Sequence, residues 1–154
     1  MSRLFSMLFL EVETSEGINM LQGLTTVSYW ADDVDAAKKW YGNLLGIEPY
    51  FNVPNENGSL AYTEFRVGDY QHELGIIDRR FAPFEAKASG VIVFWHVADV
   101  QATLEKLIAM GAKELEAPKD RGKGFITATV IDPFDNVLGT MYNPHYLEVL
   151  KGEK

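Results

Sequence analysis

Residues 24–46 read LTTVSYWADDVDAAKKWYGNLLG, a short β-rich stretch followed by an Asp pair and a helical pattern that ends at a glycine. Residues 90–111 follow the same plan, so that ADDVD at 31–35 is echoed 66 positions later by VADVQ at 97–101. From residue 54 onward the offset is 64. A period of about 65 residues is too long for a helical solenoid and too short for two ordinary domains. The sequence therefore predicts two half-domains that share one structure.

Each copy is predicted to fold as a strand, a helix and three further strands. Asp32 or Asp33 can cap the first helix by accepting hydrogen bonds from its first turn, and Gly46 suits its C-terminal end. Residues 132–136, DPFDN, form a dense turn signal before the last strand. The expected elements are a strand over 24–30, a helix over 33–45 and strands over 47–53, 60–67 and 70–78, then a strand over 91–97, a helix over 99–110 and strands over 113–117, 125–131 and 137–142.

The repeat also sets the expected domain organisation, a single domain over residues 20–154. Its parts are repeat one at about 22–78, a linker at 79–89, repeat two at about 90–144 and a C-terminal tail at 145–154. Residues 1–19 lie outside the repeat. Their apolar run, residues 4–10, is short for a signal peptide, and Glu11 follows where a cleavage site would have small residues. We expect this N-terminal extension to be an appendage that packs on the domain or on a partner.

The composition is that of one soluble globular domain, with 154 residues, 47% hydrophobic and 23% charged. The absence of cysteine excludes disulfides, thiol nucleophiles and thiolate metal sites, and we expect a cytoplasmic protein. No apolar stretch reaches the roughly 20 residues of a membrane span. A net charge of −8 disfavours nucleic acid and anionic membranes as partners, whereas it would suit a cationic ligand.

The tandem plan, the stretch ADDVDAAKKWYGNLLGIEPY at 31–50 and the DPFDN turn resemble the vicinal oxygen chelate superfamily. That group includes glyoxalase I, extradiol dioxygenases and the fosfomycin- and bleomycin-resistance proteins. The resemblance covers about residues 22–144 and departs from the family's Asp-Pro-Asp-Gly-Asn turn at Phe134 and Asp135. It implies an α+β fold in which tandem βαβββ repeats form one curved, cup-like mixed sheet with the helices outside. It also implies a ligand inside the cup and, commonly, a homodimer.

The resemblance implies a divalent metal held by the first and last strands of each copy, typically through His and Glu. The matching positions here are Thr26 and Gly75 in the first copy and Ile92 and Gly139 in the second. These residues offer at most one weak hydroxyl ligand, and a slip of one residue would turn each side chain to the opposite face. We therefore predict no metal and no other cofactor, as in bleomycin-resistance-type members, which bind a ligand without transforming it.

The sequence contains three histidines. Strand alternation places His72 and Glu73 on opposite faces, with Glu73 toward the cup and His72 away from it. His96 is expected at the rim of the cup, where a half-exposed strand-end histidine needs no chemical role. His145 falls in a loop beyond the last strand. A mononuclear metal held by Glu73 and His96 is a minor alternative.

The expected ligand-binding residues are those that strand parity turns into the cup. They are Thr26, Ser28, Trp30, Glu73, Phe94, His96 and Met141. Gly75 and Gly139 are expected to leave room for a flat ligand to approach the backbone. The alternative is a filled core in which Trp30, Phe94 and Met141 face each other without a cavity. Residues 121–125, RGKGF, are expected to form a loop over the mouth of the cup.

The strand at 60–67 leaves two alternatives open. It presents either Tyr62, Glu64 and Arg66 or the intervening Thr63 and Phe65 to the cup, according to the register of the following hairpin. A two-residue turn at 68–69 favours the first set, and a longer loop the second.

Three functions compete at this point. The leading prediction is a metal-free protein that binds, and so sequesters, a small aromatic or cationic molecule. The second is an enzyme of the same fold, a lyase, isomerase or dioxygenase that uses displaced metal ligands or a metal-free acid or base such as Glu73. The third is a structural or regulatory module whose cup is filled. No catalytic residue is assigned.

Overall fold

The structure is a computed structural model that describes residues 24–152 except 84, 86 and 89. The predicted N-terminal extension, residues 1–19, lies outside the described residues, so its packing and the domain boundary at residue 20 stay predictions.

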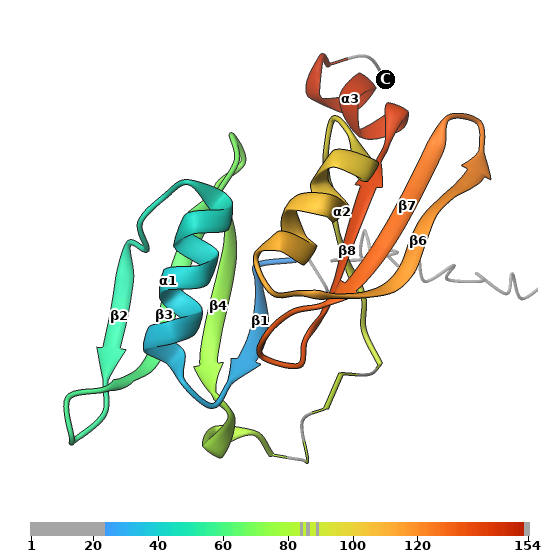
Figure 1. The fold of residues 1–154 in the computed structure, drawn as a ribbon. Coiled ribbons are helices and arrows are strands. Elements are labelled where there is room, and N and C mark those ends of the chain that lie inside the picture. Colours follow the sequence, from blue (N-terminus) through green and yellow to red (C-terminus); the bar gives the residue numbers. More distant parts are fainter. Residues whose placement is uncertain (1–23, 84, 86, 89, 153–154) are drawn as a thin grey trace, which may run out of the picture.

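Two βαβββ modules follow each other along the chain, and each forms its own four-stranded mixed sheet (Figure 1). The first contains β1 (Thr26–Ala31), α1 (Val34–Leu45), β2 (Phe51–Pro54), β3 (Leu60–Val67) and β4 (His72–Asp78), then a short 3₁₀ helix, η1 (Arg79–Phe81). The second contains β5 (Val93–His96), α2 (Val100–Ala109), β6 (Lys113–Gly122), β7 (Phe125–Ile131) and β8 (Val137–Tyr142), then α3 (Pro144–Leu150). The strand orders are β1-β4-β3-β2 and β5-β8-β7-β6. The predicted α+β class and tandem βαβββ plan are confirmed. The expectation of one curved sheet is wrong, because the described strands of each module hydrogen-bond only within their own four-stranded sheet.

Three elements differ clearly from the sequence-based expectation. The strand expected over 47–53 begins only at Phe51, as β2, so residues 47–50 are irregular. Strand β6 continues to Gly122, so most of the predicted mouth loop belongs to the β6–β7 hairpin. The predicted C-terminal loop is the helix α3, which carries His145. Asn143 caps this helix by accepting a hydrogen bond from the backbone N–H of Tyr146 at 2.9 Å, with Pro144 in the first helical turn.

The two module helices begin in the same way. Asp33 caps α1 by accepting a hydrogen bond from Ala36 N at 2.9 Å, and Asp99 caps α2 by accepting one from Ala102 N at 2.9 Å. Gly46 ends α1 in the left-handed conformation at φ 69°, which a residue without Cβ adopts without strain. The helix boundaries predicted from the repeat are therefore confirmed to within one residue.

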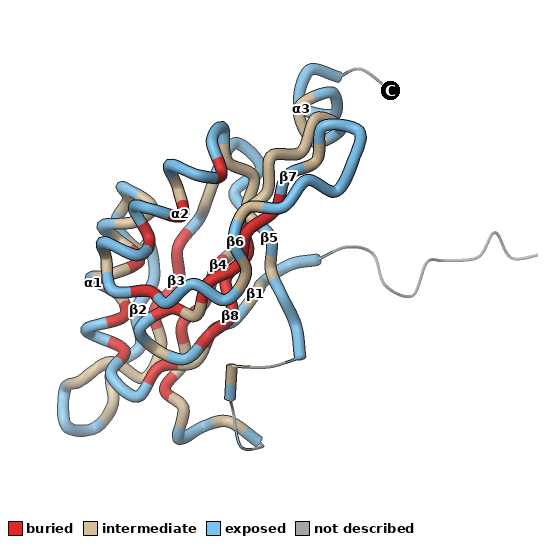
Figure 2. The backbone as a smooth tube through the Cα atoms, turned by 45° about the vertical axis from the view of Figure 1, so that its right-hand side comes forward, coloured by how far each residue is buried: buried red, intermediate tan, exposed pale blue. Residues whose placement is uncertain are grey.

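Both helices lie on the same side of the molecule, each across its own sheet (Figure 1). Beneath them the buried residues of the two modules form one hydrophobic cluster, which includes Tyr29 and Tyr41 from the first module and Leu107 and Leu138 from the second. In Figure 2 the buried segments follow the strands through the middle of the molecule. The modules thus share a core instead of folding as two separate units.

The β7–β8 turn, residues 132–136, connects the second module to the first. The buried carboxylate of Asp132 accepts hydrogen bonds from the Tyr41 hydroxyl at 2.5 Å and from the backbone N–H groups of Phe134 and Asn136 at 2.9 and 2.8 Å. The Asn136 carboxamide bonds both the N–H and the C=O of Trp30, each at 2.9 Å. These contacts fix the turn against α1 and β1.

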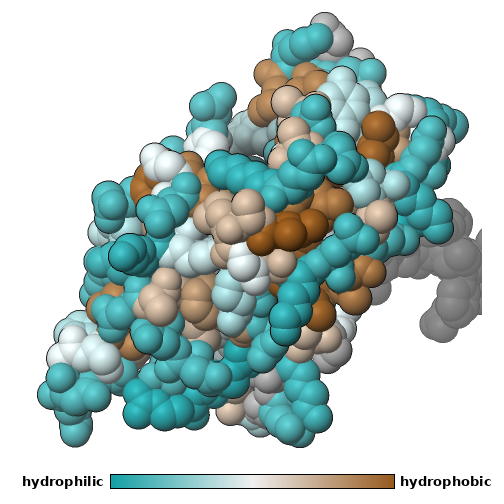
Figure 3. Space-filling view, viewed as in Figure 1, coloured by the Kyte–Doolittle hydropathy of each residue, from teal (hydrophilic) through white to brown (hydrophobic). Residues whose placement is uncertain are grey.

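The helix-covered side of the molecule is largely hydrophilic, with hydrophobic atoms gathered near its centre and its upper end (Figure 3). Within the residues that the structure describes, no helix is both long and apolar enough to span a membrane.

Candidate functional site

We call the side of each sheet opposite its helix the open face. In the first module three rows of paired residues cross this face between β1, β4 and β3. The rows are Thr26–Glu73–Arg66, Ser28–Gly75–Glu64 and Trp30–Ile77–Tyr62. The predicted binding residues Thr26, Ser28, Trp30 and Glu73 therefore share one face, as strand parity indicated.

The register of the β3–β4 hairpin decides between the two sets that the sequence left open. Val67 pairs with His72, so the loop spans the four residues 68–71 and is the longer of the two alternatives. The expectation that a longer loop presents Thr63 and Phe65 is wrong, since Glu64 pairs with Gly75. Gln71 closes the loop by donating its backbone N–H to Gly68 O at 3.0 Å, with both residues at positive φ. A two-residue and a four-residue loop give the same parity, because each shifts the pairing by an even number. Tyr62, Glu64 and Arg66 consequently lie on the open face.

Glu64 is at the centre of a polar cluster on this face. Its side chain is held by two phenols, because the hydroxyls of Tyr50 and Tyr62 each donate to one carboxylate oxygen. The residue is only 8% exposed. The hydrogen bond to Glu64 is the main reason that the pKa of Tyr50 is raised to about 12. Burial first, and then the bond to Glu64, raises the pKa of Tyr62 further above its usual value, so both phenols remain hydrogen-bond donors at neutral pH.

Glu73 forms the second half of the cluster. It accepts a hydrogen bond from Thr26 Oγ1 at 2.9 Å. The Tyr50 hydroxyl, whose single proton Glu73 shares with Glu64, lies 3.2 Å from Glu73, and Arg66 approaches Glu73 at 3.6 Å. The bond from Thr26 is the largest cause of its lowered pKa, and those with Tyr50 and Arg66 add to it. We call Thr26, Tyr50, Tyr62, Glu64, Arg66 and Glu73 together the Glu64 cluster.

Aromatic rings cover the two glycines at the family's metal positions. A Cβ added to Gly75 would stand 2.6 Å from the Tyr62 hydroxyl oxygen, and one added to Gly139 would stand 2.5 Å from Cδ1 of Phe94. The prediction that these glycines leave room for a flat ligand is therefore wrong. The missing side chains are replaced by rings from within the protein, Tyr62 from β3 and Phe94 from β5.

These residues do not fit the divalent metal that the fold implies. A side chain long enough to bind metal at Gly75 or Gly139 would collide with those rings. Among the described residues, no three His, Cys, Asp or Glu side chains are grouped so that they could hold a metal ion. The alternative metal site built on Glu73 and His96 gains no third ligand of these types there. The metal-free protein stays a prediction that only an assay can test.

The second module's open face is less polar. Phe94 pairs with Gly139 and His96 with Met141. The His96 Nδ1 atom accepts a hydrogen bond from Asn143 N at 3.2 Å. The centre of the His96 ring lies 5.2 and 5.7 Å from those of Tyr146 and Tyr142, with the ring planes tilted by 39° and 41°. A small rim cavity of about 170 Å³ is lined by His72, Phe94, Trp95, His96, Met141, Asn143 and Tyr146. His72, predicted to point away, reaches this cavity because it is the first residue of β4, at the rim of its sheet.

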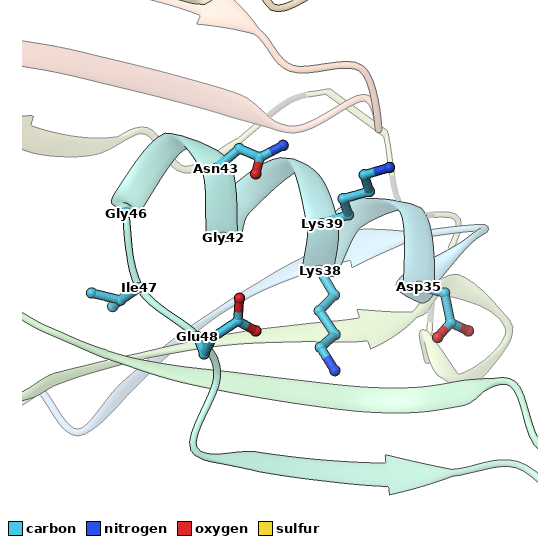
Figure 4. A pocket seen from close by; sticks show the side chains of 8 residues that line it. All are labelled: Asp35, Lys38, Lys39, Gly42, Asn43, Gly46, Ile47 and Glu48. Carbon is cyan, nitrogen blue, oxygen red and sulfur yellow. The ribbon is translucent and has the colours of Figure 1, made fainter.

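Two larger hollows differ in character. One of about 490 Å³ lies along β1 and is lined by Val27, Ser28, Tyr29, Trp30, Lys87, Gly90, Val91, Val93, Asn136 and Val137. The other, of about 440 Å³, lies beside α1 and the segment after it (Figure 4). Its lining carries Asp35, Lys38, Lys39 and Glu48, charges of both signs that are largely in contact with water. Only the first hollow contains predicted binding residues, Ser28 and Trp30.

Residues 23–139 match the family model of the Glyoxalase/Bleomycin resistance protein/Dioxygenase superfamily. The chain belongs to this superfamily. No curated protein sequence gives a significant match.

Several solved structures share the fold at low sequence identity. A glyoxalase-related enzyme from Fulvimarina pelagi has a TM-score of 0.65 at 18% identity and covers 80% of this chain and 90% of its own. A superfamily member from Sphaerobacter thermophilus has a TM-score of 0.63 at 16% identity, with coverages of 80% and 99%. TioX from Micromonospora sp. ML1 has a TM-score of 0.58 at 17% identity, with coverages of 78% and 98%. At such identities the likeness concerns the fold and leaves the activity open.

Sequence reasoning missed part of the site. Tyr50 precedes β2 in an irregular segment, where no strand parity applies, and nothing in the sequence connected it with Glu64. Glu64 and Arg66 were recognised only as one of two alternatives. The even spacing of residues 62, 64 and 66 was the available signal, and the hairpin register was the missing information.

Proposed function

We propose that the protein binds a small molecule on the open face of its first module, without a metal, and does not transform it. The observation that carries the proposal is the Glu64 cluster, a nearly buried carboxylate held by two phenols in the same row of the sheet as Ser28. Ser28 in turn lines the 490 Å³ cavity along β1. That volume lies within the range of about 300–1,000 Å³ that is usual for small-molecule sites.

The chemistry of the face favours an aromatic or cationic ligand. Burying a carboxylate is costly unless it is hydrogen-bonded, and Glu64 is bonded to neutral phenols, so its charge is not cancelled. Trp30, Tyr50 and Phe51 add aromatic surface to the same sheet, and Phe51 is 48% exposed. Rings beside an uncompensated negative charge provide stacking and cation–π contacts.

Phe94, His96 and Met141 are proposed to complete the binding surface from the second module. Apolar residues are exposed on both open faces. A bound ligand or a second copy of the chain would cover them. Phe51 and Val53 in the first module and Ile92 and Phe94 in the second are 38–48% exposed. A homodimer is accordingly part of the proposal. Light scattering at micromolar concentration tests it, and a monomer mass would contradict it.

Binding itself is tested by titrating a set of aromatic cations, neutral aromatics and anions while tryptophan fluorescence is recorded. Replacing Trp30 with Ala should weaken binding by about 1–3 kcal/mol, the usual effect of losing a buried aromatic contact. Glu73→Gln should weaken the binding of cations and leave neutral ligands almost unchanged. Glu48→Gln, which makes the same change of charge beside the α1 hollow, is the matched control.

The proposal fails if no compound in the set binds, and the filled structural module then becomes the better description. Equal losses for cationic and neutral ligands in Glu73→Gln would mean that Glu73 acts through folding and not through recognition.

A second candidate, a metal-free lyase or isomerase, is favoured by one observation. Glu64 lies next to Gly75, the family's metal position, and is flanked by two phenols, so it could accept or return a proton. Turnover of a bound compound that is lost in Glu64→Gln while binding is retained would favour the enzyme over the binding protein.

A further inference from the structure

Arg66 already places a cation in the Glu64 cluster. Its guanidinium carbon lies 4.0 Å from the centroid of the Tyr50 ring, and its terminal nitrogen is 3.6 Å from Oε1 of Glu73. A planar cation over an aromatic face with a carboxylate at its side is the arrangement that proteins use to recognise cationic groups. The protein thus supplies from its own chain what a cationic ligand would supply from outside.

This internal contact is loosely held. The side chain of Arg66 is 48% exposed and that of Glu73 29% exposed, and Tyr50 is 46% exposed. Ion pairs open to water contribute little to stability, and at 3.6 Å this pair is longer than a direct charge-assisted hydrogen bond. The long, flexible side chain of Arg66 can therefore leave the ring and turn into solvent at small cost.

The net charge of the Glu64 cluster also favours the binding of a cation. Glu64 and Glu73 are both acidic and Arg66 is the basic member, so that one negative charge remains unmatched within the cluster. The phenols of Tyr50 and Tyr62 are neutral donors, since their pKa values are raised. An incoming cation that replaced Arg66 would find the ring, the Glu73 carboxylate and the second carboxylate of Glu64 in one place.

The second module provides the contrast. Arg121 has a terminal nitrogen 2.5 Å from Glu116 and donates through Nε to Thr127 Oγ1 at 2.9 Å. It therefore has two short directional bonds, whereas Arg66 is held by a ring contact and a long ion pair. Arg121 has the geometry of a structural arginine, and Arg66 that of an exchangeable one.

We propose that Arg66 occupies the subsite for a planar cationic group of the ligand, a guanidinium or amidinium, and that binding displaces it from Tyr50 and Glu73. The proposal deepens the proposed function and rests on it, since it names the ligand class and the residue that competes with the ligand. Because a ligand must displace Arg66, this residue lowers the apparent affinity of the site for cations.

The test compares Arg66→Gln with the wild-type protein by isothermal titration calorimetry. The probes are benzamidine, benzamide and benzoate, which share one ring and differ in charge. Removing a competing unit charge near the carboxylates should tighten benzamidine binding about tenfold, as expected for charges a few ångströms apart near a protein surface. Benzamide should bind equally to both proteins. Arg121→Gln changes the net charge by the same amount and should leave benzamidine binding unchanged.

A direct role of Arg66 as an anion contact gives the opposite pattern, with benzoate binding lost in Arg66→Gln. That result overturns the proposal, as does benzamidine binding that is absent, unchanged or weakened in the variant. Combining Arg66→Gln with Glu73→Gln should abolish the gain, and a gain that persists would also overturn it. Circular dichroism confirms that each variant is folded.

The experiment also separates failure of the cation subsite from failure of the proposed binding function. If wild-type protein binds other compounds on the open face while Arg66→Gln gains nothing for benzamidine, the binding function stands and the cation subsite does not.

Discussion

The two modules meet the same structural problem in different ways. Each has a glycine on the strand beside its first strand, Gly75 in β4 and Gly139 in β8, and an aromatic ring over it. In the first module the ring is Tyr62 of β3, and its hydroxyl connects it to Glu64. In the second it is Phe94, the direct pairing partner of Gly139, with no polar group. The duplicated backbone has therefore been kept, while a polar site exists on one copy and an apolar surface on the other.

The loops before the last strands differ as much as the faces do. The β3–β4 loop, residues 68–71, is exposed throughout, whereas the β7–β8 turn is inserted between the modules through Asp132 and Asn136. The copies are thus asymmetric in their roles, because the second copy positions itself on the first.

The largest expected effect follows from this asymmetry. Asp132→Ala should lower the free energy of unfolding by about 3 kcal/mol, because the buried Tyr41 hydroxyl and two backbone N–H groups lose their acceptor. Asp69→Ala in the exposed loop of the first copy is the matched control and should stay within about 0.5 kcal/mol. Urea unfolding measures the stability of both variants. Similar losses of stability would contradict the claim that, of these two loops, only the β7–β8 turn holds the two modules together.

An intermediate effect is expected from filling the covered glycines. Gly139→Ala should cost about 1–3 kcal/mol, since the new methyl group overlaps the rings and methyls of Phe94 and Ile92. In the background of Phe94→Ala the same substitution should cost clearly less, because the overlapping ring is gone. A double-mutant cycle from thermal unfolding measures this coupling. Additive costs would show that Phe94 does not lie over Gly139 in solution.

The smallest expected effect on stability comes from the C-terminal end of β4, which differs from that of its counterpart β8. Strand β4 ends at Asp78, which accepts hydrogen bonds from the Arg80 backbone N–H at 2.9 Å and from its Nε at 3.0 Å, whereas β8 ends at Tyr142. The bonds from Arg80 are the main reason that the pKa of Asp78 is lowered to about 2. A carboxyl group whose pKa is lower in the folded than in the unfolded state stabilises the fold above about pH 4, and this is lost as pH falls toward 2.

Asp78→Asn should therefore be less stable than wild type at pH 5, and the difference should shrink as the pH approaches 2. Because the Arg80 side chain is 68% exposed, water screens the pair and the difference at pH 5 should be about 1 kcal/mol. Urea midpoints at pH 5, 3 and 2 provide the measurement. If the stability difference between wild type and Asp78→Asn does not change with pH, the ionised Asp78 carboxylate is not its cause.

Most of the fold could be predicted from the sequence because two copies of one pattern support each other. The helix caps Asp33 and Asp99 and the terminator Gly46 use local rules that act within a few residues of the chain. The faces of β1 and β4 follow from strand alternation alone. Helix α3 was missed although Asn143 and Pro144 form a cap followed by an N-terminal proline, a signal as local as the others.

The site was less predictable, for a different physical reason. A glycine in a strand reveals that a side chain is missing, but not that a ring such as Tyr62 or Phe94 turns into the vacated space. That depends on rotamers and on neighbouring strands. Tyr50 lies beside Glu64 in an irregular segment, where its backbone N–H donates to Glu64 O at 3.0 Å and its hydroxyl bonds the Glu64 carboxylate. Its role therefore depends on the pairing of two segments that are distant in sequence.

Asn136 has a consequence for association as well as for folding. Strand β1 is an edge of its sheet, and free main-chain groups on such an edge can pair with a strand of another molecule. A carboxamide offers both N–H donors and a C=O acceptor, as a peptide group does, and Asn136 uses one of each on the main chain of Trp30. One side chain thus takes the place of a neighbouring strand at Trp30, and another molecule cannot add a strand at that position without displacing it.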